Sequence, residues 1–172
     1  MIKGIFNNNL YFVDKVDEVV RLIKLGRKED ECFIYDMKKD ISYKDVRLDS
    51  LNDVYELKIF YHFNNCDYEI LNIDDVYNLA YFHVKDLSLF DEVEDLVVKK
   101  AKYMRYTKAR LGVNYRKKTL PDYYLVAVTL DKKFVVEFKD YINNTVKSID
   151  FIGNDIKEYY MNEIEFVKKI HL

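Results

Sequence analysis

Short runs of apolar residues separated by turn-forming residues mark the first part of the chain. Ile2–Phe6 and Leu10–Val13 flank the triplet Asn7–Asn9, and asparagine tolerates the positive φ that a tight hairpin turn requires. The same pattern recurs in two later pairs of runs, 54–63 with 68–73 and 123–130 with 134–138. We therefore expect three antiparallel β-hairpins, and apolar residues on both faces of 123–130 indicate a central or well-covered strand.

Each hairpin is followed by a segment that carries the signals of a helix. A first helix would be capped by Asp14, end at Gly26 and present one apolar face made of Val16, Val19, Val20 and Ile23. Asp74 and Asp75 supply a cap for a second helix over 76–84, and a third helix follows Lys139. Two interpretations stay open: a hairpin–helix unit repeated three times, or an accident of short connections.

The strongest helical pattern runs from Ser88 to Leu111. Ser88 and Asp91 suit a capped, acidic first turn, and Gly112 ends the segment. One apolar stripe along it holds Phe90, Val93, Val97, Ala101, Met104 and Leu111. We therefore predict an α+β fold in which antiparallel β-hairpins pack against helices, with one long helix near Ser88–Leu111.

The remaining segments complete this expected architecture. Cys32–Met37 is predicted to add a strand, with Cys32 as a small core residue, whereas Lys38–Asp53 is polar and predicts an irregular surface connection. Asn154–Ile170 has helical spacing, and Glu165–Leu172 also fits an edge strand. A length of 172 residues suits a single α+β domain. A subdivision into 1–87 and 119–172, joined by the helix 88–112, is the alternative.

Composition narrows the class of protein. The chain has four glycines and one proline, which argues against Gly-rich phosphate loops and low-complexity linkers. No apolar run approaches the length of about 18 residues that a membrane span needs. Met1–Asn9 lacks the sustained apolar region of a signal peptide, and two cysteines suit a reducing compartment. We expect a cytoplasmic protein.

The C-terminal part carries a resemblance to a known family. The residues concerned are Pro121–Leu125, the turn Asp131–Lys133 and Phe138–Ile142. With them, Leu120–Leu172 resembles a family of small uncharacterised bacterial domains that are often encoded beside toxin–antitoxin components. The chain ends where those domains usually continue with another strand. The family has no catalytic residues to carry over, so the resemblance implies partner binding and a bacterial or phage origin.

Charge is strongly segregated along the chain. Between Asp49 and Asp95 there are twelve acidic residues and two lysines, whereas Lys99–Lys118 has nine lysines and arginines and no acidic residue. The net charge of −2 conceals this asymmetry, which indicates a charged partner.

The basic segment 99–118 is the one group of residues whose chemistry indicates a class of ligand. Cations that neutralise phosphates, interleaved with tyrosines that stack on bases, suit RNA or single-stranded DNA. A solvated helix face, pairing with the chain's own acidic half and a protein partner are the alternatives. The candidate binding residues are Lys102, Tyr103, Arg105, Tyr106, Lys108, Arg110, Tyr115, Arg116, Lys117 and Lys118.

Motifs for catalysis or metal binding are missing from the sequence. The glycines stand alone and no Gly-x-Ser-x-Gly occurs, which disfavours nucleotide hydrolysis and acyl transfer. His62, Cys66 and His83 are the best candidate metal ligands, but they lack the second close pair that structural zinc sites use. We expect no catalytic residue, no cofactor and no metal.

These observations predict a non-enzymatic protein-interaction module, an inhibitor or antitoxin-like protein whose partner is another protein. Nucleic-acid binding through 99–118 is the alternative. In a specialised version, the protein inhibits a nucleic-acid enzyme by presenting an acidic surface as a phosphate mimic. That surface would consist of Asp67, Glu69, Asp74, Asp75, Asp91, Glu92, Glu94 and Asp95.

Overall fold

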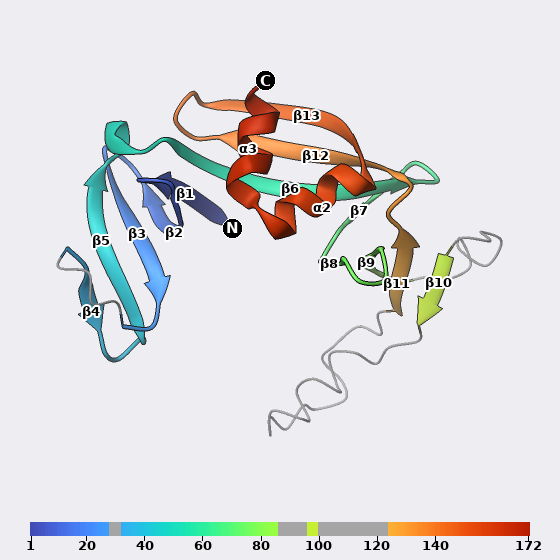
Figure 1. Cartoon of the computed structure of the whole chain (residues 1–172), viewed down its shortest axis with the longest axis horizontal. Coiled ribbons are helices and arrows are strands. Elements are labelled where there is room, and N and C mark those ends of the chain that lie inside the picture. Colours follow the sequence, from blue (N-terminus) through green and yellow to red (C-terminus); the bar gives the residue numbers. More distant parts are fainter. Residues whose placement is uncertain (28–31, 86–95, 100–123) are drawn as a thin grey trace. The chain divides into compact units, whose positions relative to one another are not determined.

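The computed structural model of the chain describes residues 1–27, 32–85, 96–99 and 124–172. Over these residues the protein is mostly antiparallel β-sheet, with 58% strand and 16% helix (Figure 1). The expected α+β fold is therefore wrong, because most of the segments expected as helices are strands. Among the described residues, no helix is long and apolar enough to cross a membrane.

The described strands and helices follow one another in a fixed order. The strands are β1 (Ile2–Phe6), β2 (Asn9–Val16), β3 (Val19–Leu25), β4 (Ile34–Asp36), β5 (Ile41–Arg47), β6 (Asp53–Phe63), β7 (Cys66–Glu69), β8 (Asn72–Asp74), β9 (Leu79–Val84), β10 (Leu96–Lys99), β11 (Tyr124–Thr129), β12 (Lys133–Asp140) and β13 (Thr145–Ile152). The helices are the 3-10 turn η1 (Leu48–Ser50), α2 (Gly153–Met161) and α3 (Glu163–His171).

The strands form two sheets. One has the order β13-β12-β6-β1-β2-β3-β5-β4, with β7 also paired to β6, and the other has the order β10-β11-β9-β8. The chain divides into two compact units, which are described separately. Unit 1 contains 1–58, 136–149 and 164–172, and unit 2 contains 59–135 and 150–163.

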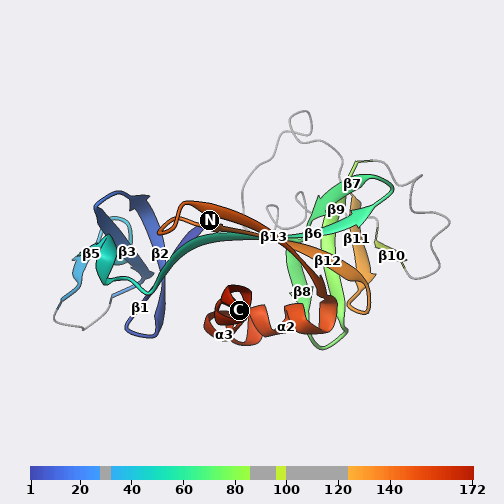
Figure 2. The ribbon, with the colours of Figure 1, turned by 90° about the horizontal axis from the view of Figure 1, so that it is seen from above.

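Unit 1 contains a curled meander of five main strands (Figure 2). Their order in the sheet is β6-β1-β2-β3-β5, and η1 lies between β5 and β6 in the chain. Successive side chains of a strand point to opposite faces, so one face of the meander forms the core and the other does not. The core face holds Tyr11, Val13, Val20, Leu22, Leu51 and Val54.

Helix α3 covers part of the opposite face of unit 1, over β6 and β12 (Figure 1). Its buried residues are Phe166, Val167 and Ile170. Tyr55 of β6 stacks on Phe138 of β12, with their ring centroids 5.3 Å apart. The helical expectation for Asn154–Ile170 is confirmed as two helices, separated at Asn162, and the edge-strand alternative is wrong.

Unit 2 is built around a cluster of aromatic rings. The ring of Tyr61 lies 5.7 Å from that of Phe82 and 5.8 Å from that of Phe134, measured between centroids. β11 pairs with both β9 and β10, and its residues Val126, Ala127 and Val128 are buried, which confirms the expectation of a well-covered strand.

The first expected helix, after Asp14, is instead the end of β2 and the whole of β3. Val20 and Leu22 are fully buried, whereas Val19 and Leu25 are 52% and 72% exposed. This alternation has a period of two, and the β-branched side chains of the segment suit a strand. β2 and β5 lie on either side and supply the backbone hydrogen bonds that a helix would have made internally.

Three hairpin turns share one local motif, which explains the other two wrong helices. In each, an aspartate ends a strand, and a residue with positive φ follows four positions later: Asp36 and Asp40, Asp74 and Asn78, Asp140 and Asn144. The aspartate Oδ1 accepts hydrogen bonds from the backbone N–H groups two and three positions on. A helix N-cap makes the same bonds, so Asp74 and Asp140 carry a cap signal but open the turns before β9 and β13.

Three further expectations are corrected. β10, over Leu96–Lys99, is a strand inside the segment expected as the long helix Ser88–Leu111, because it pairs with the buried strand β11. The rest of that segment lies outside the described residues. Lys38–Asp53 is not irregular, since β5 and η1 occupy most of it. The strand within Cys32–Met37 is confirmed as β4, but Cys32 is exposed and not a core residue.

Candidate protein-binding surface

The face of unit 1 opposite its core carries a row of apolar side chains across four strands. In register, Phe12 of β2 lies opposite Ile23 of β3, Ile23 opposite Tyr43 of β5, and Tyr43 opposite Ile34 of β4. Directly opposed residues of an antiparallel pair lie on the same face, so these four side chains form one continuous row. Phe12 is 37% exposed and Ile34 60% exposed. We call this set the apolar row.

A fixed cation lies beside the apolar row. The guanidinium carbon of Arg21 lies 4.5 Å from the centroid of the Tyr43 ring. Arg21 also donates two hydrogen bonds to Asp45, 2.7 Å from Nε to Oδ1 and 2.8 Å from Nη2 to Oδ2. These bonds lower the pKa of Asp45 and raise that of Arg21, so both groups stay charged. Two hydrogen bonds and a ring contact hold Arg21 in one orientation.

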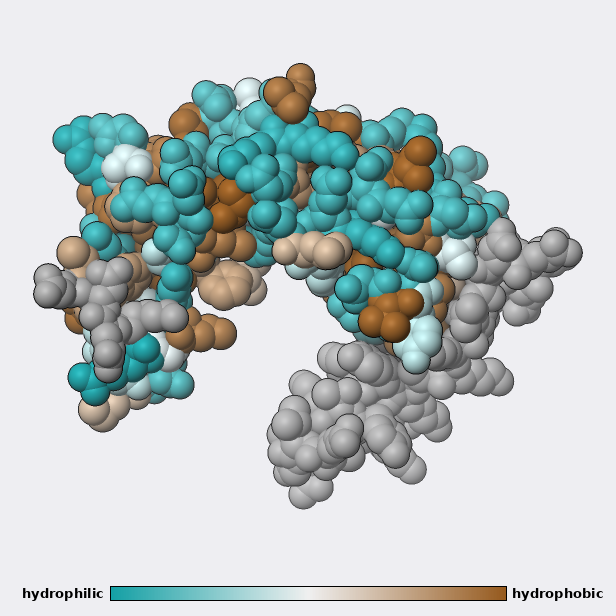
Figure 3. Space-filling model, in the orientation of Figure 1, coloured by the Kyte–Doolittle hydropathy of each residue, from teal (hydrophilic) through white to brown (hydrophobic). Residues whose placement is uncertain are grey.

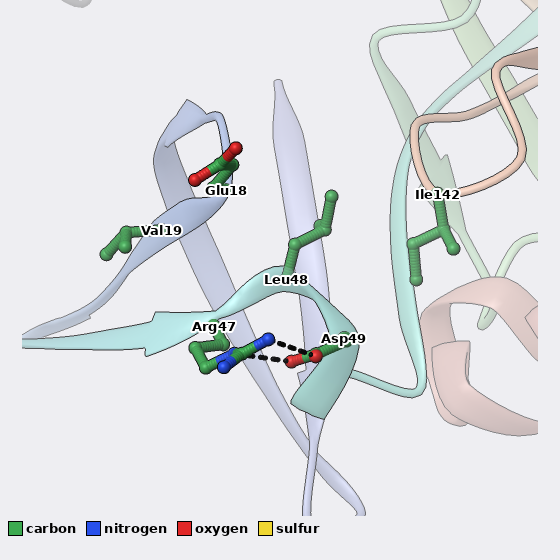
Figure 4. A pocket seen from close by; sticks show the side chains of 6 residues that line it. All are labelled: Glu18, Val19, Arg47, Leu48, Asp49 and Ile142. Carbon is green, nitrogen blue, oxygen red and sulfur yellow. Dashed lines mark hydrogen bonds and ion pairs between the residues drawn. The ribbon is translucent and has the colours of Figure 1, made fainter.

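A groove of about 680 Å³ opens at one end of this face (Figure 4). Val19 of β3, Leu48 of η1 and Ile142 of the β12–β13 turn give it an apolar lining, and its charged residues are Glu18, Arg47 and Asp49. Its shape is fixed by local bonds. The Leu48 N–H donates to the Glu18 carbonyl oxygen at 3.0 Å, and Arg47 Nη2 donates to Asp49 Oδ2 at 2.8 Å.

The groove and the apolar row belong to one surface. A smaller depression of about 210 Å³ is lined by Asp14, Lys15, Val19, Arg21 and Asp45. It shares Val19 with the groove, and its Arg21 contacts Tyr43 of the apolar row. Figure 3 shows hydrophobic residues at the surface among hydrophilic ones where β3, β4 and β5 lie. We call the groove, the depression and the apolar row together the binding face.

The chemistry of the binding face suits contact with a protein chain. Both arginines of the face are paired within it, Arg21 with Asp45 and Arg47 with Asp49, so around these pairs the face offers apolar area and hydrogen-bonding groups rather than unpaired positive charge. Tyrosine and arginine are enriched at the centres of protein interfaces, where they combine large contact area with hydrogen bonding. A groove of this size with an apolar lining accepts one or a few side chains of a partner.

The residues of the expected nucleic-acid site lie outside the described part of the chain, since all ten fall within 100–123. Of the expected acidic surface, Asp91, Glu92, Glu94 and Asp95 also lie outside it. Asp67, Glu69, Asp74 and Asp75 are described and belong to unit 2. Two of these four bond within the protein: Asp67 accepts from His62 Nδ1 at 2.7 Å, and Asp74 holds the β8–β9 turn.

The candidate metal ligands do not form a cluster. His62 lies opposite Asp67 and Phe63 opposite Cys66 in the β6–β7 hairpin, so His62 and Cys66 point to opposite faces. Burial lowers the pKa of His83, which lies on β9. Among the described residues, no group of three or more His, Cys, Asp and Glu side chains could hold a metal ion.

One group of titratable side chains in unit 1 escaped the sequence analysis. His171 Nε2 lies 2.8 Å from Asp53 Oδ1, and the His171 ring meets the Phe138 ring edge-on at 5.3 Å. Burial raises the pKa of Asp53, against the opposing effect of His171. Asp140 is buried, which opposes its ionisation, but hydrogen bonds from Asn143 and Ile142 outweigh this effect and lower its pKa. The His171–Asp53 bond ties the end of α3 to β6.

Sequence reasoning also missed the binding face. Phe12 and Ile34 were expected in strands, but Val19 and Ile23 were assigned to a helix and Tyr43 to a surface connection, which hides the cross-strand neighbours. The period-two alternation of exposed and buried residues from Val19 to Leu25 is the signal that could have revealed a strand with one apolar, open face. The alternation does not show which strands pair with this one, so the apolar row could not be predicted from it.

Comparison of the chain with models of protein families, with curated proteins and with solved structures finds no match.

Proposed function

We propose that the protein is a non-enzymatic interaction module that binds another protein through the binding face of unit 1. The observation that carries this proposal is the apolar row, which runs in register across four strands next to a groove and is exposed at Phe12 and Ile34 and half-buried at Ile23 and Tyr43. An inhibitor or antitoxin-like role is one form of this function.

The physical support is the cost of leaving such a surface in water. Each square ångström of apolar surface that a partner removes from water contributes about 25 cal/mol, so an ordered apolar row beside a groove favours association. The groove and Arg21 are already fixed by hydrogen bonds within unit 1. A preformed surface loses little conformational entropy on binding, which favours affinity.

Substitution in the groove tests the proposal. Val19 is 52% exposed, so Val19→Asp should leave the fold intact while placing a charge in the apolar groove. Val146→Asp is the matched control, because Val146 is 61% exposed and does not line the groove. We expect a stoichiometric protein partner to co-purify from native lysate at low salt with the wild type and with Val146→Asp, and to be lost with Val19→Asp.

Two results would contradict the proposal. One is the lack of any stoichiometric protein partner under these conditions. The other is a partner that Val19→Asp retains as well as the wild type does, since binding would then use another surface. Nucleic-acid binding through 99–118 stays a prediction, and titration with RNA and single-stranded DNA at about 50 mM salt tests it, because phosphate contacts are strong there.

A further inference from the structure

The β8–β9 turn of unit 2 presents two large apolar side chains to solvent. Val76 is 77% exposed and Tyr77 73% exposed, at neighbouring positions in the chain. Leu71, just before β8, is 50% exposed. Exposed apolar residues that stand singly are ordinary, but an adjacent pair at the tip of a hairpin needs a reason.

The turn is held rigidly on both sides of this pair. Asp74 Oδ1 accepts hydrogen bonds from the backbone N–H groups of Val76 at 3.1 Å and Tyr77 at 3.0 Å. Asn78 has a φ of 56°, and its carbonyl oxygen accepts a hydrogen bond from Leu130 N–H at 3.0 Å. The two side chains are therefore displayed from a fixed backbone, and little entropy is lost when a partner binds them.

One sister turn shows that the motif does not require apolar residues at these positions, although the other has Ile142 at the first of them. The turn from Asp36 to Asp40 has the same hydrogen bonds and the same positive φ at its last residue, yet it carries Lys38 and Lys39 where the β8–β9 turn has Val76 and Tyr77. The motif accepts two lysines, so the apolar pair serves something other than the turn.

Among the described residues, the charges closest to the tip in the chain are acidic. From Asn72 to Val84 the chain has Asp74 and Asp75 and no lysine or arginine. The neighbouring β11–β12 turn contributes Asp131, Lys132 and Lys133, and Lys133 pairs with Asp150 at 2.5 Å. A partner that receives the tip gains from positive charge around its pocket, because complementary charge speeds association and sets orientation.

We propose that the β8–β9 turn is a preformed anchor that inserts Val76 and Tyr77 into an apolar pocket with a basic rim on a protein partner. The inference rests on the proposed function, because it assumes a protein partner, but it concerns a surface in the other unit. Tyrosine suits this role, since its ring fills a pocket while its hydroxyl reaches the polar edge. As the anchor of an interface, the pair should be an energetic hot spot.

Site-specific photo-crosslinking tests the anchor. A photo-reactive phenylalanine analogue is placed at position 77, at position 39 as the equivalent site of the sister turn, or at position 19 in the groove. Each full-length protein is irradiated in native lysate. We expect crosslinking of one protein from position 77 and not from position 39. With that protein purified, Val76→Lys should weaken binding at least about 30-fold, and Asp75→Lys should weaken it less and remove part of its salt dependence.

The possible results separate the two proposals. Crosslinking from position 19 without crosslinking from position 77 overturns the anchor and leaves the proposed function standing. No crosslinking from either position counts against both. Equal crosslinking from positions 77 and 39, or binding that Val76→Lys leaves unchanged, also overturns the anchor. Unchanged denaturation midpoints for the lysine variants, expected from the sister turn, show that any loss of binding does not come from unfolding.

Discussion

The shared turn motif predicts that its three aspartates contribute very unequally to stability. Asp140 and Asp36 allow the cleanest comparison, because both open a turn of the same geometry and both belong to unit 1. The perturbation is replacement of each aspartate by alanine, one at a time. Alanine removes the acceptor oxygens and leaves the positive-φ residue that ends each turn in place.

The expected magnitudes follow from burial and from the bonds lost. Asp140 is 6% exposed and accepts from Ile142 N–H at 2.8 Å, from Asn143 N–H at 3.0 Å and from Asn143 Nδ2 at 2.7 Å. Hydrogen bonds to a charged group contribute about 1.5–3 kcal/mol each, but they are not additive. We expect Asp140→Ala to lower the free energy of unfolding by about 3 kcal/mol.

Asp36 is only partly buried and accepts two backbone bonds, at 3.0 and 3.4 Å. Water can replace the lost acceptor there, so the loss should resemble that of an exposed helix cap. We expect Asp36→Ala to cost about 1 kcal/mol.

Urea denaturation followed by circular dichroism at about pH 7 measures both values, since the linear extrapolation gives the free energy of unfolding. Asp140→Asn is the conservative control, because asparagine keeps an acceptor oxygen in the same place and supports the same turn. It should recover part of the loss. Two results would refute the reasoning: equal costs for Asp140→Ala and Asp36→Ala, or a cost below about 1 kcal/mol for Asp140→Ala. In either case the residues with positive φ would determine the turns without the aspartates.

Two further predictions concern the cost of a side chain at Gly153 in unit 2 and the loss of the Asp140 contribution to stability in acid. A Cβ at Gly153 would lie 2.1 Å from the backbone carbonyl oxygen of Leu130, so we expect Gly153→Ala to cost about 3 kcal/mol in urea denaturation. Gly4→Ala, whose Cβ would meet only the methyl group of Val13 at 3.1 Å as its nearest neighbour, should cost less than about 1 kcal/mol, and equal costs would contradict the prediction. The pKa of Asp140 lies below its ordinary value of 3.8, so its ionised form stabilises the fold above that pH and the contribution is lost as the pH falls. The stability difference between wild type and Asp140→Asn should therefore shrink between about pH 7 and pH 3, and a constant difference would contradict it.

The sequence by itself determined the tight turns and the covered strand. Asn7 and Asn8 adopt the positive φ values that their turn predicted, and Asn64 and Asn65 adopt them in the β6–β7 turn, because asparagine reaches the left-handed region at little cost. The apolar faces of 124–130 likewise predicted a strand between two neighbours. These are local properties of residue type and periodicity, so a single sequence is enough to show them.

The tertiary structure decided which aspartate signals begin helices and which begin turns. Asp74 and Asp140 make the same two backbone hydrogen bonds in a hairpin turn that they would make as helix caps. The choice depends on whether the following residues find a strand to pair with, and that partner is distant in sequence. For β3 the partners are β2 and β5, and for β9 they include β11.

The binding face also came from the tertiary structure alone. Phe12, Ile23, Tyr43 and Ile34 are separated in the chain and become one row only through the register of four strands. A shift of one residue in any strand would turn its side chain to the other face. The groove adds Ile142, which only the fold brings to Val19 and Leu48. Sequence periodicity identifies the exposed side of one strand, whereas long-range pairing decides what lies beside it.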